Sequence, residues 1–300
     1  MDIVSTVADL NDQLAFQRSQ SGAIGFVPTM GALHEGHVSL IRACTAKTDC
    51  CVVSIFVNPL QFSEHEDFDD YPRCLDDDIA ILKREGVSVL FCPTVNELYL
   101  FGPAQSIRFD LPDYATLLCG QSRPHFFEGV CSVVLRLFMI VRPDCAFFGE
   151  KDYQQGLIIQ QMCRDLFLPI EIEMVPIVRE VDGLAMSSRN RYLNSEQRQS
   201  AVCLYQLLTF ICDQFRQGIL SSDQLLQLGS EFISKQPAIQ IDYLTILSLD
   251  WRLNPDVCHS SDRVLVAAYF EIDKGARDCI RLIDNMPLLA LSRNTQSAAF

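Results

Sequence analysis

The first two thirds of the chain alternates between short, continuously apolar runs and longer stretches in which apolar residues recur with helical spacing. The apolar runs lie at residues 23–27, 51–57, 87–91, 145–148 and 170–178. The helical stretches lie at residues 38–47, 75–85 and 153–166. Continuous apolar runs are typical of strands buried on both faces, and alternation with helices favours a parallel sheet with right-handed crossovers. We therefore predict a doubly wound, Rossmann-like α/β domain.

The pattern changes after residue 183. Two long helical patterns cover residues 195–217 and 222–235. Strand-like runs follow at residues 239–249, 264–272 and 278–283. We predict that residues 1–183 form the Rossmann-like domain and that residues 184–300 form a smaller α+β domain, folded over the sheet edge as a lid. The polar tail 292–300 lacks periodicity, and we expect it to be frayed.

Polar residues follow four of the predicted strands directly. The corresponding loops begin at Pro28, Asn58, Gly149 and Arg179. In open α/β sheets, ligands bind outside the carboxyl ends of the strands. We therefore expect these loops to converge on one edge of the sheet and to form the binding site.

Composition and charge exclude several classes of function. The chain is 49% hydrophobic and 21% charged, as globular proteins are, and its formal net charge of −14 disfavours general nucleic-acid binding. The longest apolar stretch, 130–141, contains Ser132 and Arg136 and is too short to cross a bilayer. The N-terminus lacks a signal-peptide pattern. We expect a cytoplasmic protein with no nucleic-acid or membrane partner.

The thirteen cysteines show no C-x-x-C spacing. Their odd number and the lack of a secretion signal indicate reduced thiols, and small buried core residues are the simplest interpretation. We assign no metal-ligating residue.

The segment 28–37 links the first predicted strand to its helix and carries two of the five histidines. Gly31 and Gly36 permit close approach of the backbone, and a helix start offers main-chain N–H groups to an anion. His34 and His37 lie three residues apart and therefore on one face of a helix. Two imidazoles can donate to phosphate oxygens without the desolvation cost of a buried lysine. Zinc is disfavoured because only the intervening glutamate is near in sequence as a third ligand.

These residues carry a family resemblance. The string 34–37 is similar to the H-x-G-H signature of nucleotidyltransferases and class I aminoacyl-tRNA synthetases, and 186–189 resembles their KMSKS-type phosphate element. Longer strings closely resemble the pantothenate synthetase (pantoate–β-alanine ligase) family. They lie at residues 28–37, 54–62, 71–73, 148–155, 182–190 and 281–285. The resemblance covers nearly the whole chain.

The resemblance implies amide formation in two steps. ATP and pantoate give an enzyme-bound pantoyl adenylate and pyrophosphate; the amine of β-alanine then attacks the acyl carbon and releases AMP. A carboxylate does not accept an amine directly, because its leaving group would be an oxide, whereas the mixed anhydride provides AMP. No enzyme nucleophile is needed, so the site positions the reactants and neutralises charge. The family also implies a homodimer.

The family's site residues have counterparts in this chain. His34, His37, Lys151 and Arg189 would be the catalytic groups, with His37 as the proton donor, Lys151 as a point charge and Arg189 as a bidentate phosphate ligand. The nucleotide site would comprise Met30, Gly31, Ala32, Leu33, His34, Glu35, Gly36, His37, Gly149, Glu150, Lys151, Asp152, Val178, Met186, Ser187, Ser188 and Arg189.

Further roles are implied for single members of this set. Gly36 would leave room for the adenine ring, and Val178 would contribute a backbone contact near it. Asp152 would hold the ribose or orient a cation. Ser187 and Ser188 would clasp the departing pyrophosphate together with the adjacent arginine.

Gln61 and Gln155 would bind pantoate, with Gln61 also near β-alanine. A glutamine amide can donate to a carboxylate without forming an ion pair, which leaves the carboxylate able to act as a nucleophile. Mg²⁺ is expected to accompany ATP. Residues 76–78 are three aspartates that serve equally well as outer ligands of this ion or as a helix N-terminal charge cluster.

The chain departs from the family pattern at one place. The family reads Arg-Pro-x-His-Phe-x-Gly-Val, whereas residues 123–130 place His125 one position early and Phe126 at the usual histidine position. Neighbouring side chains of an extended loop point to opposite sides. We therefore expect His125 to point away from the site, Phe126 to face it or its wall, and Arg123 to supply positive charge to the nucleotide. A local backbone shift that returns His125 to the usual place is the alternative.

Other functions share parts of this pattern. Another adenylyl or cytidylyl transferase of the same fold would keep the two histidines but would not require Gln61 and Gln155. A tRNA synthetase fragment is disfavoured by the net charge. A non-catalytic nucleotide-binding regulator remains an alternative, although the intact His34, His37 and Lys151 argue against loss of activity.

Overall fold

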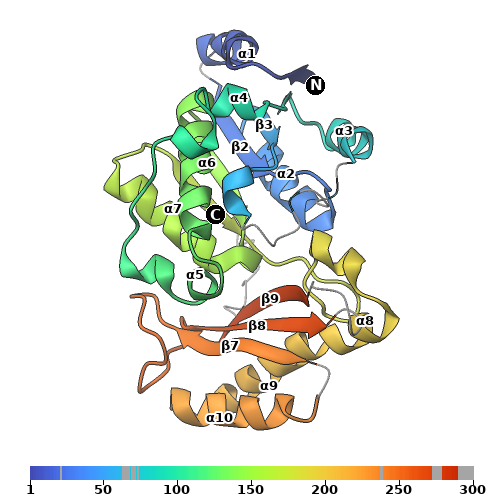
Figure 1. Cartoon of the computed structure of the whole chain (residues 1–300), viewed down its shortest axis with the longest axis vertical. Helices are drawn as coiled ribbons and strands as arrows, with labels where there is room; N and C mark the ends of the chain where they lie inside the picture. Colours follow the sequence, from blue (N-terminus) through green and yellow to red (C-terminus); the bar gives the residue numbers. More distant parts are fainter. Residues whose placement is uncertain are drawn as a thin grey trace, which may run out of the picture. The chain divides into compact units, whose positions relative to one another are not determined.

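The computed structural model describes residues 1–20, 22–62, 68, 72, 74–236, 239–271 and 279–289. It divides into two compact units, Met1–Arg179 with Met186–Ser188, and Glu180–Ala185 with Arg189–Phe300 (Figure 1). The boundary predicted after residue 183 falls inside the segment in which the chain leaves the first unit, returns to it and leaves again. Tyr71 and Arg73 of one matching string, and the tail 292–300, lie outside the described residues.

All six strands of the first unit run parallel, in the order β1-β4-β3-β2-β5-β6. The strands are β1 (Asp2–Val4), β2 (Ile24–Thr29), β3 (Cys50–Ile55), β4 (Val89–Phe91), β5 (Cys145–Gly149) and β6 (Glu171–Val175). The longer helices are α1 (Val7–Ser19), α2 (Glu35–Lys47), α3 (Leu75–Arg84), α6 (Phe126–Val141) and α7 (Tyr153–Asp165). The predicted doubly wound sheet is confirmed, although the run at 170–178 pairs only as far as Val175.

Helices cover both faces of this sheet. Neighbouring residues of a strand point to opposite faces, so each strand buries side chains against helices on both sides. On β2, Val27 packs in a cluster with Leu40 and Ile41 of α2. The adjacent Phe26 meets Phe138 of α6, with ring centroids 6.3 Å apart. Each such fully buried side chain contributes about 1.5–3 kcal/mol relative to an exposed one. This two-sided burial explains why the strands read as continuous apolar runs.

The four polar loops predicted to converge follow β3, β2, β5 and β6, which are neighbours in the sheet. Because these strands are parallel, their carboxyl ends lie at the same edge. Two of the loops begin with short 3-10 helices, Pro59–Gln61 after β3 and Glu150–Asp152 after β5. Pro28 and Gly149, at which two of the loops were predicted to begin, still belong to β2 and β5, so those loops begin one or two residues later than predicted. The topology places the starts of the candidate loops together.

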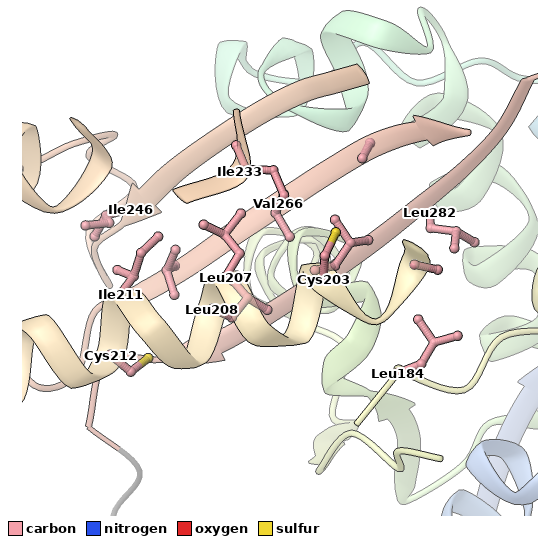
Figure 2. Close-up of a cluster of buried hydrophobic side chains, with 14 of the residues drawn as sticks. Leu184, Cys203, Leu207, Leu208, Ile211, Cys212, Ile233, Ile246, Val266 and Leu282 are labelled. Atoms are coloured by element: carbon pink, nitrogen blue, oxygen red, sulfur yellow. The ribbon is translucent and has the colours of Figure 1, made fainter. Parts of the chain in front are cut away.

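The second unit has a three-stranded antiparallel sheet, β7 (Gln240–Leu247), β8 (Arg263–Glu271) and β9 (Cys279–Pro287), in the order β7-β8-β9. Its helices are α8 (Ser195–Ala201), α9 (Cys203–Arg216) and α10 (Ser222–Ile233). Figure 2 shows Leu207 and Ile211 of α9 directed towards the sheet, in a core that includes Val266. The α+β prediction is confirmed, but the pattern at 195–217 forms two helices that meet at Val202 rather than one.

Most of the described cysteines are core residues, as their number and spacing in the sequence predicted. Of the twelve whose side chains are described, ten are buried. Burial raises the pKa of several thiols, to about 12 for Cys131 and Cys203, so these groups stay protonated at neutral pH. In the part of the chain that the structure describes, no helix is both long and apolar enough to cross a membrane.

Candidate active site

The loop between β2 and α2 has an unusual backbone. Gly31 and the following Ala32 both have positive φ, 83° and 51°, which places them in the left-handed region that non-glycine residues seldom adopt. Buried Asp78 on α3 accepts hydrogen bonds from the main-chain N–H groups of Ala32 at 2.9 Å and Leu33 at 2.8 Å. Interior hydrogen bonds therefore define the path of the chain into the histidine pair.

His34 and His37 cap the start of α2 together. The Nδ1 atom of His34 accepts from the N–H of Gly36 at 3.1 Å, and the Nδ1 atom of His37 accepts from the N–H of His34 at 3.3 Å. A main-chain N–H only donates, so each neutral imidazole carries its hydrogen on Nε2. The ring centroids lie 4.2 Å apart. The two imidazoles lie together as predicted, but His34 is the extended N-cap residue before α2 and does not lie on a helix face. Both rings have a donor at Nε2.

Burial is the main reason that His37 is uncharged. Burial, together with the positive charges that His34 and Lys151 can carry, lowers the pKa of His37 to about 3. His37 is therefore a neutral hydrogen-bond donor near neutral pH. The influence of Lys151 also shows that the structure brings the loop after β5 close to the histidine pair.

Gly36 is required for a reason that the sequence did not indicate. A Cβ atom at this position would lie 2.8 Å from Cε1 of the His34 imidazole. The missing side chain thus makes room for the capping ring itself. The role of Gly36 beside the adenine ring stays a prediction.

Lys151 and Asp152 follow β5 in the 3-10 helix Glu150–Asp152, as expected for a loop at the sheet edge. The Nζ atom of Lys151 lies 3.4 Å from Oδ1 of Asp152, and the lysine side chain is only 21% exposed against 48% for the aspartate. A solvated surface pair would not bury its cation in this way. The geometry therefore favours the interpretation of Lys151 as a site residue.

The phosphate element at 186–189 is divided between the units. The N–H of Met186 donates to the carbonyl of Val178 at 3.0 Å, which ties Met186–Ser188 to the first unit. Met186 also lies beside the histidine loop, 3.9 Å from the position that a Cβ of Gly36 would occupy. Arg189 belongs to the second unit, in the 3-10 helix Ser188–Tyr192. The joint action of the serines and the arginine on phosphate stays a prediction.

Gln61 ends the 3-10 helix after β3, and α6 holds this segment. A Cβ on Gly129 of α6 would lie 2.2 Å from the carbonyl oxygen of Leu60, so the two main chains are in contact. Buried Asn58 donates to the carbonyl of Gly129 at 3.0 Å and accepts from the hydroxyl of Tyr99 at 2.8 Å. Sequence reasoning missed these three contacts; an asparagine directly after a buried strand was the available signal.

Gln155 has a neighbour with a different role. Gln154 is 4% exposed; its Oε1 accepts from the N–H of Cys119 at 3.1 Å, and its Nε2 donates to the carbonyl of Leu117 at 2.8 Å. Gln155 lies next to it on α7 and is half-buried. Gln154 is therefore a structural residue, and Gln155 is the member of the pair that remains a candidate for substrate binding.

The segment that departs from the family pattern agrees with only part of our expectation. His125 is 81% exposed and bonds Glu128 through Nδ1 at 2.9 Å, so its side chain points into solvent. Its backbone is left-handed, with φ of 66°, rather than extended as we assumed. The guanidinium of Arg123 lies 3.8 Å from the centroid of the Phe126 ring and donates to the main-chain carbonyl of Gln61 at 3.0 Å. Arg123 thus supports the Gln61 segment.

Comparisons with known proteins match nearly the whole chain. The family profile described as pantoate-beta-alanine ligase matches residues 2–287. The pantothenate synthetase of Carboxydothermus hydrogenoformans is 43% identical over 288 residues, 96% of this chain and 99% of that protein. That of Hahella chejuensis is 45% identical over 287 residues, 95% of this chain and 98% of that protein.

Solved structures agree with these relatives. The pantothenate synthetase of Thermus thermophilus has a TM-score of 0.87 and 42% identity, with 97% of this chain and 100% of that chain covered. A pantoate-beta-alanine ligase from Francisella tularensis, complexed with beta-gamma ATP and beta-alanine, has a TM-score of 0.75 and 33% identity, with 96% and 98% covered. The chain belongs to the pantoate–β-alanine ligase family.

Proposed function

We propose that the chain joins pantoate to β-alanine at the expense of ATP, through a pantoyl adenylate, and releases AMP and pyrophosphate. Family membership over residues 2–287 supports the ligation, and the Francisella tularensis relative is described with beta-gamma ATP and beta-alanine. The observation that carries the proposal is the pair of neutral imidazoles at the start of α2, each with its hydrogen on Nε2, beside Lys151.

In the first step, a carboxylate oxygen of pantoate attacks the α-phosphorus of ATP. The new oxygen–phosphorus bond forms as the bond to the bridging oxygen breaks, and pyrophosphate leaves with the electron pair. Negative charge on the phosphate oxygens is stabilised by the Nε2–H groups of His34 and His37 and by the ammonium of Lys151. A hydrogen bond to a charged group contributes about 1.5–3 kcal/mol.

In the second step, the amine of β-alanine attacks the acyl carbon and AMP leaves from the tetrahedral intermediate. The neutral amine forms the new C–N bond and gives up one proton to solvent, the C–O bond to AMP breaks with its electron pair, and no enzyme nucleophile takes part. Gln61 and Gln155 bind pantoate through amide groups, which orient its carboxylate without neutralising it. Ser187, Ser188 and Arg189 hold the pyrophosphate.

A Mg²⁺ ion bound to ATP would supply positive charge that neutralises the phosphate oxygens. Within the described residues, no three His, Cys, Asp or Glu side chains are grouped to hold a metal ion. Both carboxylate oxygens of Asp78 bond main-chain N–H groups of the histidine loop. Asp76 and Asp77 are exposed in the first turn of α3 and are the members of the cluster that suit an outer-ligand role.

We also propose a cytoplasmic homodimer. The family resemblance supports the dimer, and ten buried cysteine thiols among the described side chains suit a reducing compartment. Sedimentation equilibrium tests the oligomeric state, and fractionation of the native cells tests the location.

Isotope exchange tests the two-step order. We expect labelled pyrophosphate to enter ATP when pantoate is present and β-alanine is absent, because the adenylate forms and reverses without the amine. The complete reaction should yield AMP rather than ADP. Exchange that begins only after β-alanine is added would contradict a free adenylate step. Exchange that needs no pantoate would instead favour another nucleotidyl transferase.

A further inference from the structure

Asp78 is a buried carboxylate that the reaction described above does not use. It lies in the first turn of α3 and is 2% exposed, whereas Asp76 and Asp77 in the same turn are exposed. Oδ2 accepts from the N–H of Ala32 at 2.9 Å, and Oδ1 accepts from the N–H of Leu33 at 2.8 Å. An ionised carboxylate tolerates such burial when donors of this kind replace water.

The three elements that meet at Asp78 come from different parts of the chain. Burial and the negative charge of Asp78 raise the pKa of the Cys92 thiol, directly after β4, to about 11. A Cβ on Gly31 would lie 3.0 Å from Oδ2 of the same carboxylate. Asp78 therefore lies where α3, the end of β4 and the loop after β2 come together, and it forms part of the wall of a cavity of about 350 Å³.

The loop that Asp78 holds is conformationally costly. Gly31 and Ala32 are consecutive left-handed residues, and alanine pays a steric penalty for this conformation. The carboxylate bonds the two N–H groups that this backbone directs towards it. Leu33 is joined directly to His34, whose imidazole caps α2, so the loop determines where the first turn of the helix begins.

We propose that Asp78 is a positioning residue for adenylation, which acts through the N–H groups of Ala32 and Leu33 to fix His34 and His37 against the phosphates. The inference rests on the proposed role of the two histidines. When the carboxylate is lost, the loop relaxes from its left-handed path and the Nε2 hydrogens leave the positions at which the phosphate oxygens bind.

The substitution Asp78→Asn tests this role with little change in size. It removes the negative charge and sets an amide N–H against one of the loop N–H groups. We expect pantoate-dependent pyrophosphate exchange to fall about 10- to 100-fold in kcat, because two charge-assisted hydrogen bonds are weakened at a distance from the substrates. Aminolysis of supplied pantoyl adenylate should change less than threefold, because this step does not use the phosphate contacts of the two histidines.

A matched control is Asp262 of the second unit, which is also 2% exposed and accepts from the N–H of His259 at 2.8 Å. Asp262→Asn should lower the stability of the protein but leave exchange per folded molecule unchanged. Equal losses in both variants, or equal losses in the two half-reactions of Asp78→Asn, would reduce Asp78 to a fold-stabilising residue and overturn the proposal.

The titration of the His37 ring, followed by NMR without substrates, separates this inference from the proposed function. Release of the loop exposes the imidazole, so we expect the pKa of His37 to rise from about 3 towards 6.5 in Asp78→Asn. An unchanged titration would overturn the positioning role whatever the reaction is. Inactivity of the wild type with pantoate would overturn the proposed function but not this result.

A second variant covers the case in which Asp78→Asn does not fold. Ala32→Gly keeps the carboxylate and widens the conformational choice of the loop, since glycine populates other regions at little cost. We expect a selective loss of adenylation of about 2- to 5-fold and a smaller rise of the His37 pKa. No change in either quantity would contradict the claim that this backbone sets the histidines.

Discussion

Two of the segments that we propose to face phosphate are held in different ways. The histidine segment, residues 30–37, is fixed within the first unit by Asp78 and by the reciprocal caps of its own imidazoles. The second segment, residues 178–190, is divided. Its Met186 bonds Val178 in the first unit, whereas residues 180–185 and 189 onward belong to the second.

The interactions of the second segment are also of another kind. Glu180 accepts from Asn190 at 2.9 Å and from Arg198, and Asp182 pairs with Arg198 at 2.8 Å. These charged groups are partly exposed, whereas the histidine segment is held by buried main-chain hydrogen bonds. Partly exposed ion pairs contribute little and are screened by salt. We infer that the first segment provides fixed geometry for the chemistry and that the second tolerates change more easily.

The largest expected effect is that of His37→Ala. This change removes a Nε2–H donor from the fixed segment, and loss of one hydrogen bond to charge, about 1.5–3 kcal/mol, slows adenylation roughly 10- to 150-fold. Adenylate aminolysis should fall far less, because the proposed partner is the ATP phosphate chain. The two half-reactions are measured separately by pyrophosphate exchange and by supply of the adenylate. Equal losses in both would remove the phosphate role.

The burial of His37 should also make stability depend on pH. Its folded pKa is about 3, below the ordinary value of 6.5, so below pH 6.5 the unfolded chain binds a proton that the folded chain does not. Folding stability from this group is therefore present above pH 6.5 and is lost as pH falls towards 3. Between pH 7 and 5 the loss is about 2 kcal/mol.

Urea unfolding of the wild type and of His37→Gln at a series of pH values measures the contribution of His37 to the free energy of unfolding. Shared groups cancel in the difference, so the variant should show the shallower decline below pH 6.5. Parallel curves would mean that His37 is not buried in its neutral form, and the contrast between the two segments would then fail.

Gln155→Leu should affect pantoate rather than ATP. A substrate hydroxyl or carboxylate that loses a buried partner weakens pantoate use about 10-fold, within the 1–3 kcal/mol of an unpaired polar group. ATP affinity should be nearly unchanged. Gln154→Leu is the adjacent control. It removes the hydrogen bonds to Cys119 and Leu117, so it should lower the stability of the protein more than its use of pantoate. An equal weakening of ATP and pantoate binding by Gln155→Leu would reject its assignment to pantoate.

Arg198→Gln examines the second segment. The arginine forms ion pairs with Glu180 and Asp182. Loss of these ion pairs should weaken ATP use about 2- to 5-fold, since a partly exposed ion pair contributes about 0.2–1 kcal/mol. The effect should shrink at high salt, whereas that of His37→Ala should not. A loss of 50-fold or more, insensitive to salt, would show that both segments are fixed with equal precision.

The sequence predicted the elements whose apolar pattern is continuous and fits only one kind of secondary structure. β2, β3 and β5 are continuous apolar runs and were located closely, whereas β1 was missed because Asp2–Val4 is three residues long and its Ile3 is 49% exposed. The break between α8 and α9 at Val202 carries no glycine or proline to signal it.

The candidate site shows the same limit. His34, His37 and Lys151 were found because motif spacing and strand ends are visible in a sequence. The structural roles of Asp78 and Gln154 were not, because their partners are main-chain N–H and carbonyl groups 35 to 46 residues away. Main-chain groups are the same at every position, so only the folded path of the chain shows which of them a side chain meets.

The smallest expected effect concerns His125, which lies outside both segments. Its side chain is 81% exposed and bonds only Glu128 among the described contacts that involve its ring, so His125→Ala should change adenylation less than twofold and stability by at most about 0.5 kcal/mol. Arg123→Ala differs because its guanidinium supports the carbonyl of Gln61 and stacks on Phe126. That variant should raise the KM for pantoate more than the KM for ATP. A tenfold loss of adenylation in a stable His125→Ala protein would instead favour a backbone shift that returns this histidine to the site.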